Sequence, residues 1–529
     1  MRSSSFVRSL WAFATLVLAL GTLTFVFNQP VMAQATTGSL KGVVTDANGA
    51  VVSGATLTAK NEATGIEAQA TSNGEGLYEF ARLAPGKYTV TTEASNFKRS
   101  VNTGVDVNVG VVNPLDIKLQ AGAISETVTV TAGTEEIVNR DQAQLSTSFE
   151  TRKVEELPSN AAGGGIDTLA LLAPGVVPGF GNVNSNGTTL SVNGNRARSN
   201  NFTLDGTDNN DLTIGGPNFF VDNQDAVQEF QLITNNFSAQ YGRNQGAIVN
   251  IVTKGGTNEF HGSGFEFHRN SSALDAMTNA ERADPNRSRK DKFISNVFGG
   301  TFGGPIIKQK AFFFIDGQLT RQRQTFLFQA GNPAILPSGL ATLAANFPGN
   351  PAIAAIVNQS VFALQPSARV QGGGTALTGN ICFPKDPTLA CSGANAVLVP
   401  TGFPEYLLPL PFDQKEYGLR GDFNLTSKDS FNAKYRYQQS PETGSNSQSN
   451  GFFGDIPFKS RNLNGQYTRQ MSSRLVNNFS AAWQKLGVTF GGGCTVCKRS
   501  LYACQRPPGG IIEFCKMVID HAQMYEGGN

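Results

Sequence analysis

The stretch "EYGLRGDFNLTSKDSFNAKYRYQQ", residues Glu416–Gln439, decides the fold class because apolar and polar side chains alternate along both of its halves. One face is apolar or aromatic: Tyr417, Leu419, Phe423, Leu425, Phe431, Ala433, Tyr435 and Tyr437. The opposite face is polar: Arg420, Asp422, Asn424, Asn432, Lys434, Arg436 and Gln438. Thr426–Asp429 has the composition of a turn between the halves. Each half is long enough to cross a bilayer as a tilted strand, with one face for lipid and one for a wet lumen. A soluble sandwich is the alternative, because it shows the same alternation.

Four further segments show weaker forms of this pattern: residues 262–268, 296–304, 311–319 and 474–486. Residues 326–411 are rich in Pro, Ala and Asn and separate these segments as a long loop would. From Gln34 to Phe490 no uninterrupted apolar stretch is long enough for a helical span, so further membrane crossings are expected to be strands.

The N-terminus has the pattern of an export signal. Arg2 and Arg8 precede an apolar run, Leu10–Phe27, and the small-residue site Val31–Ala33 follows before Gln34. A cleaved signal peptide is predicted over residues 1–33, and a retained membrane anchor is the alternative because the run is long. No cysteine stands at the cleavage site, which argues against a lipoprotein.

Residues 34–120 are predicted to form a small β-sandwich, because short alternating runs are separated by turn signals such as Asn73-Gly74 and Pro85-Gly86. In the run "PLDIKLQ", Leu115, Ile117 and Leu119 are expected to face the core, while Asp116 and Lys118 face water. The segments "LKGVVTDANGAVVSGATLTA" and "TSNGEGLYEFARLAPGKYTV" resemble the carboxypeptidase regulatory-like domain. Such sandwiches are similar to starch-binding-like domains, so a sugar platform is conceivable, although strand aromatics more often belong to the core; the candidates are Tyr78, Phe80, Tyr88 and Phe97.

Residues 151–256 have mixed character, with a short helix expected at Ile166–Ala173 and a buried strand in "GAIVNIVTKGG". Four charged side chains lie in its Asn-rich part: Arg196, Arg198, Asp205 and Asp208. They are interpreted as structural ion pairs against a surrounding wall, with contact to a solute as the alternative. Asp205, Asp208 and Asp211 are spaced by three, unlike the alternate-residue ligands of an EF-hand loop, so no calcium site is expected.

Between these two parts lies "ETVTVTA", a short strand former flanked by polar sequence: Glu126, Thr127, Val128, Thr129, Val130, Thr131 and Ala132. The order of the sandwich, this segment, the mixed segment and the alternating strands resembles the Oar-like TonB-dependent outer-membrane receptors of Gram-negative bacteria. The resemblance covers residues from about 38 to 490 and implies that the short segment is the TonB box, that the mixed segment is the plug, and that the strands begin a barrel of about 22 strands. An extended peptide suits that role because it adds to the sheet edge of a partner, here the periplasmic protein TonB. The alternative is that the segment is the last strand of the preceding sandwich.

The predicted fold class is mainly β, with an N-terminal β-sandwich, an α+β plug and the first strands of an incomplete transmembrane β-barrel. The predicted divisions are a signal peptide at 1–33, the sandwich at 34–120, a linker with the TonB box at 121–150, the plug at 151–256, the partial barrel at 257–490 and an atypical Cys-rich tail at 491–529.

No enzyme is indicated. His261, His268 and His521 form no zinc-protease pattern, and no nucleophile elbow, P-loop or dinucleotide fingerprint is present. No metal site and no cofactor are expected. The 42 basic and 40 acidic side chains are scattered without long runs, so no nucleic-acid partner is expected.

The cysteines fall into two groups. Cys382 and Cys391 are the disulfide candidate, with two free thiols as the alternative. The other four, Cys494, Cys497, Cys504 and Cys515, follow Gly491–Gly493, where the alternating pattern stops. A frameshifted or misjoined reading frame is one interpretation of that tail, and disulfide or metal binding are the others. With six or seven candidate strands before it, the chain is not expected to close a receptor-sized barrel.

The function that the resemblance implies is energised uptake of a solute, carbohydrate or peptide, across the outer membrane, with TonB and outer-membrane lipid as partners. The alternative is a carbohydrate-binding, adhesion or assembly protein of the cell envelope.

Overall fold

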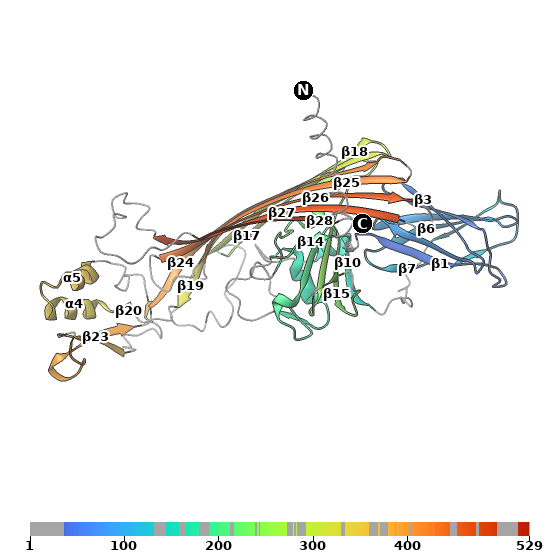
Figure 1. Cartoon of the computed structure of the whole chain (residues 1–529). Helices are drawn as coiled ribbons and strands as arrows, with labels where there is room; N and C mark the ends of the chain where they lie inside the picture. Colours follow the sequence, from blue (N-terminus) through green and yellow to red (C-terminus); the bar gives the residue numbers. More distant parts are fainter. Residues whose placement is uncertain are drawn as a thin grey trace, which may run out of the picture.

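The computed structural model describes residues 36–131, 144–157, 165–178, 190–211, 216–238, 241–242, 244–271, 279, 282, 292–329, 334–358, 369–370, 379–386, 388–402, 404–426, 428–444, 452–471, 476–494 and 517–527. The predicted signal peptide therefore lies outside the described residues. Figure 1 shows a long curved sheet with the plug on its concave side, the sandwich at one end and a small inserted domain at the other. In the described ranges no helix combines the length and the hydropathy that a membrane span needs.

The sandwich consists of two packed sheets. The first contains β4 (Leu77–Leu83), β1 (Gly38–Asp46) and β7 (Val112–Pro114), and β8 (Ile117–Leu119) also pairs with β1. The second has the order β3 (Glu67–Thr71), β2 (Thr56–Asn61), β5 (Gly86–Glu93), β6 (Arg99–Val107) and β9 (Thr127–Thr131).

The sandwich core follows the predicted alternation. Ile117 and Leu119 are buried and Leu115 packs against the core, whereas Asp116 and Lys118 are exposed. Three of the four aromatic candidates for a sugar platform, Tyr78, Phe80 and Tyr88, are buried core residues, and Phe97 packs against the core. These rings are therefore not available as an open platform.

The plug is built on a five-stranded sheet in the order β10 (Leu145–Glu150), β15 (Val227–Asn235), β16 (Ile248–Thr253), β13 (Asn201–Leu204) and β14 (Thr207–Asp208). A two-stranded sheet joins β11 (Val176–Pro178) to β12 (Leu190–Val192). Its helices are α2 (Thr151–Glu156) and the 3₁₀ turns η1 (Ile166–Leu172), η2 (Ala197–Ser199) and η3 (Gln224–Ala226). Every residue of β16 is buried, so the predictions of a buried strand and of a short helix at Ile166 are confirmed, the helix being 3₁₀.

The curved sheet has the order β17 (His261–Asn270), β18 (Phe293–Ile307), β19 (Ala311–Gln329), β24 (Pro404–Asn424), β25 (Asp429–Gly444), β26 (Phe452–Gln470), β27 (Val476–Cys494) and β28 (Met517–Gly527), with β21 (Arg369–Val370) paired to β24. Neighbouring strands are antiparallel. Among the described residues the sheet does not close, since β17 and β28 are not paired with each other. The predicted fold class is confirmed.

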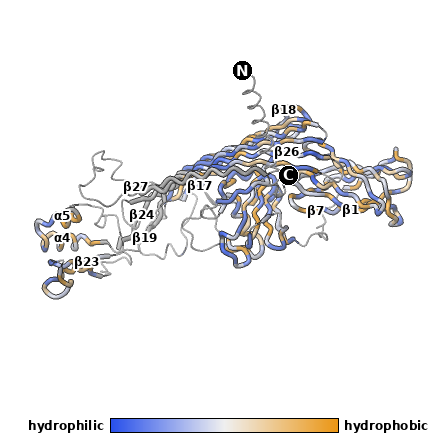
Figure 2. Tube along the Cα trace, viewed as in Figure 1, coloured by the Kyte–Doolittle hydropathy of each residue, from blue (hydrophilic) through white to orange (hydrophobic). Residues whose placement is uncertain are grey.

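The face assignment of the opening hairpin is confirmed. Tyr417 and Leu419 are exposed, whereas Lys434, Arg436 and Gln438 are buried against the plug. Hydrophilic and hydrophobic residues are interspersed in the described part of the curved sheet (Figure 2). The short turns that join β18 to β19 and β24 to β25 lie at the sandwich end of the sheet (Figure 1).

The expectation of a loop over residues 326–411 is wrong. β19 extends to Gln329, β24 begins at Pro404, and an inserted domain lies between them. This insert contains β20 (Ala334–Ile335), α4 (Pro337–Asn346), α5 (Pro351–Asn358), β22 (Gly379–Pro384), η5 (Gly393–Asn395) and β23 (Ala396–Gly402). It folds because it has its own core, Leu343, Ile353, Val397 and Val399, and a disulfide joins Cys382 to Cys391.

The C-terminal tail also differs from expectation. The strand pattern does not stop at Gly491, because β27 runs to Cys494 and β28 pairs with it from Ser480 to Phe490. An unpaired strand edge exposes a row of backbone donors and acceptors, and β28 satisfies the row on β27. Cys497, Cys504 and Cys515 lie outside the described residues.

Candidate functional site

The predicted TonB box is an edge strand of the sandwich. β9 runs parallel to β6, with Val128 beside Ser100 and Val130 beside Asn102. The Arg99 N–H donates to the Glu126 carbonyl oxygen at 2.9 Å. The position therefore matches the alternative interpretation of this segment, a last strand of the sandwich. Ala132 lies outside the described residues.

The outer edge of β9 is open. Successive residues of a strand direct their backbone groups to opposite edges, so Thr127, Thr129 and Thr131 point theirs away from β6. All three threonines are exposed, and within the described residues β9 is the last strand of its sheet. Such an edge is a template for pairing with a strand of another chain. The sandwich position is therefore compatible with binding of a partner at the free edge.

One contact between the plug and the sheet is a buried ion pair. Asp205, between β13 and β14, pairs with Lys434 of β25 at 2.9 Å, and both side chains are almost fully buried. Asp205 also accepts from the backbone N–H of Thr253 at 2.9 Å, and Arg420 of β24 donates to the Thr253 carbonyl oxygen at 2.6 Å. Burial alone raises the pKa of Asp205, but Lys434 and the neighbouring arginines outweigh it and hold the pKa at about 2.

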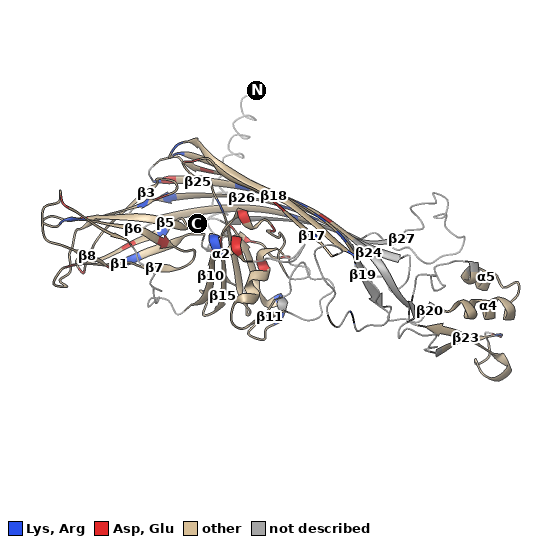
Figure 3. Cartoon of the chain, turned by 180° about the vertical axis from the view of Figure 1, so that it is seen from behind, with Lys and Arg blue, Asp and Glu red and all other residues tan. Residues whose placement is uncertain are grey.

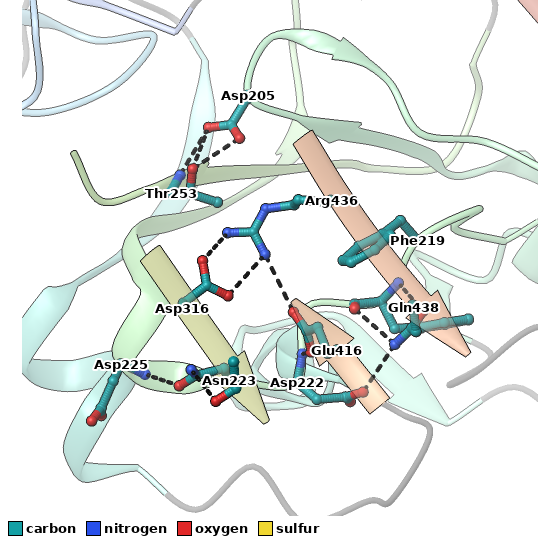
Figure 4. A network of polar contacts seen from close by, with 12 residues as sticks. Asp205, Phe219, Asp222, Asn223, Asp225, Thr253, Asp316, Glu416, Arg436 and Gln438 are labelled. Carbon is teal, nitrogen blue, oxygen red and sulfur yellow. Dashed lines mark hydrogen bonds and ion pairs between the residues drawn. The ribbon is translucent and has the colours of Figure 1, made fainter. Parts of the chain in front are cut away.

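A second cluster surrounds Arg436 of β25 (Figure 4). Its guanidinium pairs with Asp316 of β19 at 3.1 Å and with Glu416 of β24 at 3.3 Å. It also lies 5.8 Å from the centre of the Phe219 ring of the plug. Glu416 in turn accepts from the backbone N–H of Asp222 at 2.9 Å. Three strands of the wall are thereby fixed to one plug segment.

That plug segment, residues 216–223, is held mostly by amides. Gln438 accepts from the Phe220 N–H at 3.1 Å and donates to the Phe220 carbonyl oxygen at 3.0 Å. Asn218 donates to Gln484 of β27 at 3.0 Å and accepts from Ser460 of β26 at 3.0 Å. Gln414 donates to Asp222. Water can replace amide contacts of this kind at little net cost, because the net contribution of each hydrogen bond is about 1 kcal/mol.

Two buried carboxyl groups of the plug, Asp167 and Asp222, have raised pKa values. Burial, together with the charge of Asp222, raises the pKa of Asp167, at the start of η1, to about 8. Burial also raises the pKa of Asp222. The described residues contain no group of three or more His, Cys, Asp or Glu side chains that could hold a metal ion. Both signs of charge are distributed over the sandwich and the plug (Figure 3).

The sequence interpretation of the plug charges is correct for Asp205, which is an ion-pair partner of the wall. Arg196 and Arg198 are exposed, and Asp208 accepts from the amide of Asn210. The sequence predicted a polar face on β24 and β25 but not that Lys434, Arg436 and Glu416 would contact the plug. Charged residues concentrated on the lumen face of neighbouring strands were the available signal.

Two family models match the chain. Residues 252–493 match the outer membrane beta barrel domain, and residues 39–120 match the carboxypeptidase regulatory-like domain. The chain is 26% identical over 251 residues to the TonB-dependent transporter Oar of Myxococcus xanthus. The chain therefore carries an outer membrane beta barrel domain and is similar to a TonB-dependent transporter.

The regulatory-like domain precedes the barrel domain in the chain, and the barrel domain places the protein in the outer membrane of a Gram-negative bacterium. The match to Oar covers 46% of the chain and 23% of that transporter, so the chain spans less than a quarter of its length. Similar solved structures include the outer membrane transporter YddB of Escherichia coli, at 11% identity, with 66% of this chain and 39% of that chain covered and a TM-score of 0.41. A ferric enterobactin receptor of Pseudomonas aeruginosa is 12% identical, with 65% and 41% covered and a TM-score of 0.38.

Proposed function

We propose that the receptor takes part in TonB-driven uptake of a solute across the outer membrane, and that TonB binds the outer edge of β9. The observation that carries the proposal is the open edge formed by Thr127, Thr129 and Thr131, followed by the chain that leads to the plug strand β10. A strand of TonB can form backbone hydrogen bonds with this edge, so that a force applied by TonB is transmitted to the chain. The hydrogen bonds of residues 216–223 to wall amides are individually weak enough for the plug to change its position.

A proline at Thr129 is expected to weaken the binding of TonB without unfolding the sandwich. Thr129→Pro removes an N–H from the free edge, whereas the pairing of β9 with β6 uses the other edge; proline is tolerated on edge strands where the N–H side faces solvent. The affinity for the periplasmic domain of TonB is expected to fall at least tenfold, since a donor is lost and the proline ring obstructs the incoming strand. Thr129→Ala keeps the N–H and is the matched control.

The measurement is the dissociation constant of the purified full chain for the TonB periplasmic domain, determined by biolayer interferometry. Circular dichroism and melting of each variant report whether the sandwich is intact. Equal affinities of Thr129→Pro and Thr129→Ala would exclude the free edge as the TonB site. No binding by the unaltered chain would contradict the proposed function itself.

A further inference from the structure

One loop of the sandwich enters the plug. Residues 108–111 connect β6 to β7, and Val109 at their centre is fully buried. The Val109 N–H donates to Oε2 of Glu229 at 2.9 Å, and Nε2 of Gln231 donates to the Val109 carbonyl oxygen at 2.9 Å. Both partners belong to the plug strand β15 and are buried themselves. The two plug side chains therefore hold both backbone groups of one sandwich residue.

The next residue, Gly110, allows this close approach. Its φ is 64°, in the left-handed region, and a Cβ there would lie 3.1 Å from the Tyr241 hydroxyl oxygen and 3.2 Å from Oε1 of Gln231. Its N–H donates to the Thr37 carbonyl oxygen at 3.1 Å, which fixes the loop to the start of the sandwich. Glycine is needed at this position for both conformation and space.

A second contact lies at the other sheet of the sandwich. The backbone N–H of Asn258, between the plug and β17, donates to the Ala63 carbonyl oxygen at 3.1 Å, and its side chain donates to the Thr64 carbonyl oxygen. The same side chain accepts from the N–H of Gln309, in the turn between β18 and β19, at 2.8 Å. The sandwich is therefore attached to the rest of the chain at this turn as well as at Val109.

Contact between loop 108–111 and the plug shields the carboxyl group of Glu229 from water. Oε2 of Glu229 bonds to Val109, whereas no partner of Oε1 lies within the described residues. Its neighbours are Ser148 and Glu150 on β10, Gln231 on its own strand and the Val109 amide of the sandwich. Burial raises the pKa of Glu229 to about 7, although hydrogen bonds from Val109 and Ser148 oppose the rise, and the charge of Glu150 adds to it. Burying an ionised carboxylate with one free oxygen is unfavourable, so the ionised form favours separation.

The position of the loop relates it to the proposed TonB site. β6, which carries β9 along residues Arg99–Thr103, ends at Val107, directly before the loop. β9 and β6 pair at five positions, whereas Val109 is held by two hydrogen bonds. A force applied to β9 along the strand direction is shared by all hydrogen bonds between β9 and β6. The two hydrogen bonds to Val109 are therefore expected to break at a lower force than the pairing of β9 with β6.

We propose that loop 108–111 is a latch through which the sandwich holds the plug strand β15, and that this latch opens before the plug moves when a partner pulls on β9. The order of events rests on the proposed function; the latch itself does not.

Two glycine variants test the latch in the full chain in detergent. Gly110→Ala introduces a Cβ against the plug at a positive φ, whereas Gly104→Ala introduces the same strain at φ 71° where nothing lies within 4 Å. Hydrogen exchange followed by mass spectrometry is expected to be at least tenfold faster over residues 108–111 and at Glu229–Gln231 in Gly110→Ala than in Gly104→Ala. Protection of β2 and β5 reports whether the sandwich stays folded. Equal exchange in the two variants would overturn the latch.

The acid is tested separately by Glu229→Gln, which keeps an acceptor oxygen and removes the charge. In the unaltered chain the protection of residues 108–111, corrected for intrinsic exchange, is expected to fall between pH 5 and pH 8; in Glu229→Gln it is expected to stay constant. The same pH dependence in both proteins would overturn the role of Glu229.

Single-molecule pulling tests whether loop 108–111 separates from the plug before the sandwich unfolds. The force is applied through a cysteine introduced by Thr131→Cys, with and without Gly110→Ala. A low-force step that precedes unfolding of the sandwich and is absent in Gly110→Ala supports the proposal, and its persistence in Gly110→Ala overturns it. This measurement needs no TonB, so failure of TonB binding contradicts the proposed function while the latch results stand.

Discussion

The sandwich and the plug–wall interface are stabilised in opposite ways. The sandwich is held by a dry core in which Leu40, Leu57 and Val90 are fully buried. The plug is held against the wall by the ion pair between Asp205 and Lys434 and by hydrogen bonds to polar side chains of the wall. In the described residues, Phe220 of the plug forms a small apolar cluster with Phe458 and Leu486 of the wall. Burial of apolar surface is non-directional and remains effective when groups shift slightly, whereas buried ion pairs depend on geometry. The comparison suggests that the sandwich remains folded while the plug changes its contacts.

The largest expected effect comes from breaking the buried pair between plug and wall. Lys434→Met leaves the Asp205 carboxylate buried without its nearest cation and is expected to destabilise the plug by about 3–5 kcal/mol. Urea unfolding of the full chain, followed by hydrogen exchange in β13 and β16, measures this. Adding Asp205→Asn to Lys434→Met is expected to recover much of the loss. A loss below about 1 kcal/mol would show that the interface does not depend on this pair.

A core substitution in the sandwich is expected to act only there. Leu57→Ala removes a fully buried side chain and should cost about 3 kcal/mol of sandwich stability. Exchange in β2 and β5 should rise, while exchange in β16 of the plug stays unchanged. Matched increases in both regions would show that the two parts unfold as one unit and would remove the contrast between them.

Two contacts of the plug, with the wall at Asp205 and with the sandwich loop at Glu229, are expected to respond to pH in opposite directions. The pKa of Asp205 is depressed to about 2, so its contribution is present above its ordinary value of 3.8 and is lost as the pH falls through about 2. The pKa of Glu229 is raised to about 7, so its contribution to docking is complete below 4.5 and is lost as the pH rises through about 7. Raising the pH from 5 to 8 should loosen loop 108–111 and leave the Asp205 contact intact. Exchange measured at both sites over this range checks the prediction, and parallel changes would contradict it.

The smallest expected effect comes from removing the surface ion pair between Lys98 and Glu126. Nζ of Lys98 lies 2.6 Å from Oε2 of Glu126, and both side chains are partly exposed. Glu126→Gln should change sandwich stability by less than about 1 kcal/mol, since such pairs are screened by water and salt. Thermal melting of the sandwich measures it. A larger loss would mean that this pair, and not the β9–β6 ladder, holds the edge strand.

The sequence predicted features that depend on local periodicity. Alternation in Glu416–Gln439 identified both strands, their turn and their two faces, because side-chain direction in a strand follows from position alone. It did not predict that Lys434 would meet Asp205, because that contact joins residues separated by more than two hundred positions. The sequence also did not decide whether β9 pairs with β6, because the alternation in Thr127–Thr131 predicts a strand but not which strand lies beside it.

The insert was missed for a different reason. Its core consists of a few scattered side chains, Leu343, Ile353, Val397 and Val399, within a sequence whose Pro and Asn content is typical of loops. Proline at the first turn of α4 and of α5 starts these helices, so residues that suggested irregular chain are helix starts.

The position of the insert at the end of the sheet has a practical consequence. β19 and β24 pair over their whole shared length, from Ala311 with Phe423 to Gln329 with Glu405, and end beneath the insert. This paired stalk places a disulfide-closed domain at the end of the sheet opposite the sandwich (Figure 1). In an outer-membrane protein whose sandwich faces the periplasm, the insert would lie outside the cell and would offer an epitope for labelling intact cells.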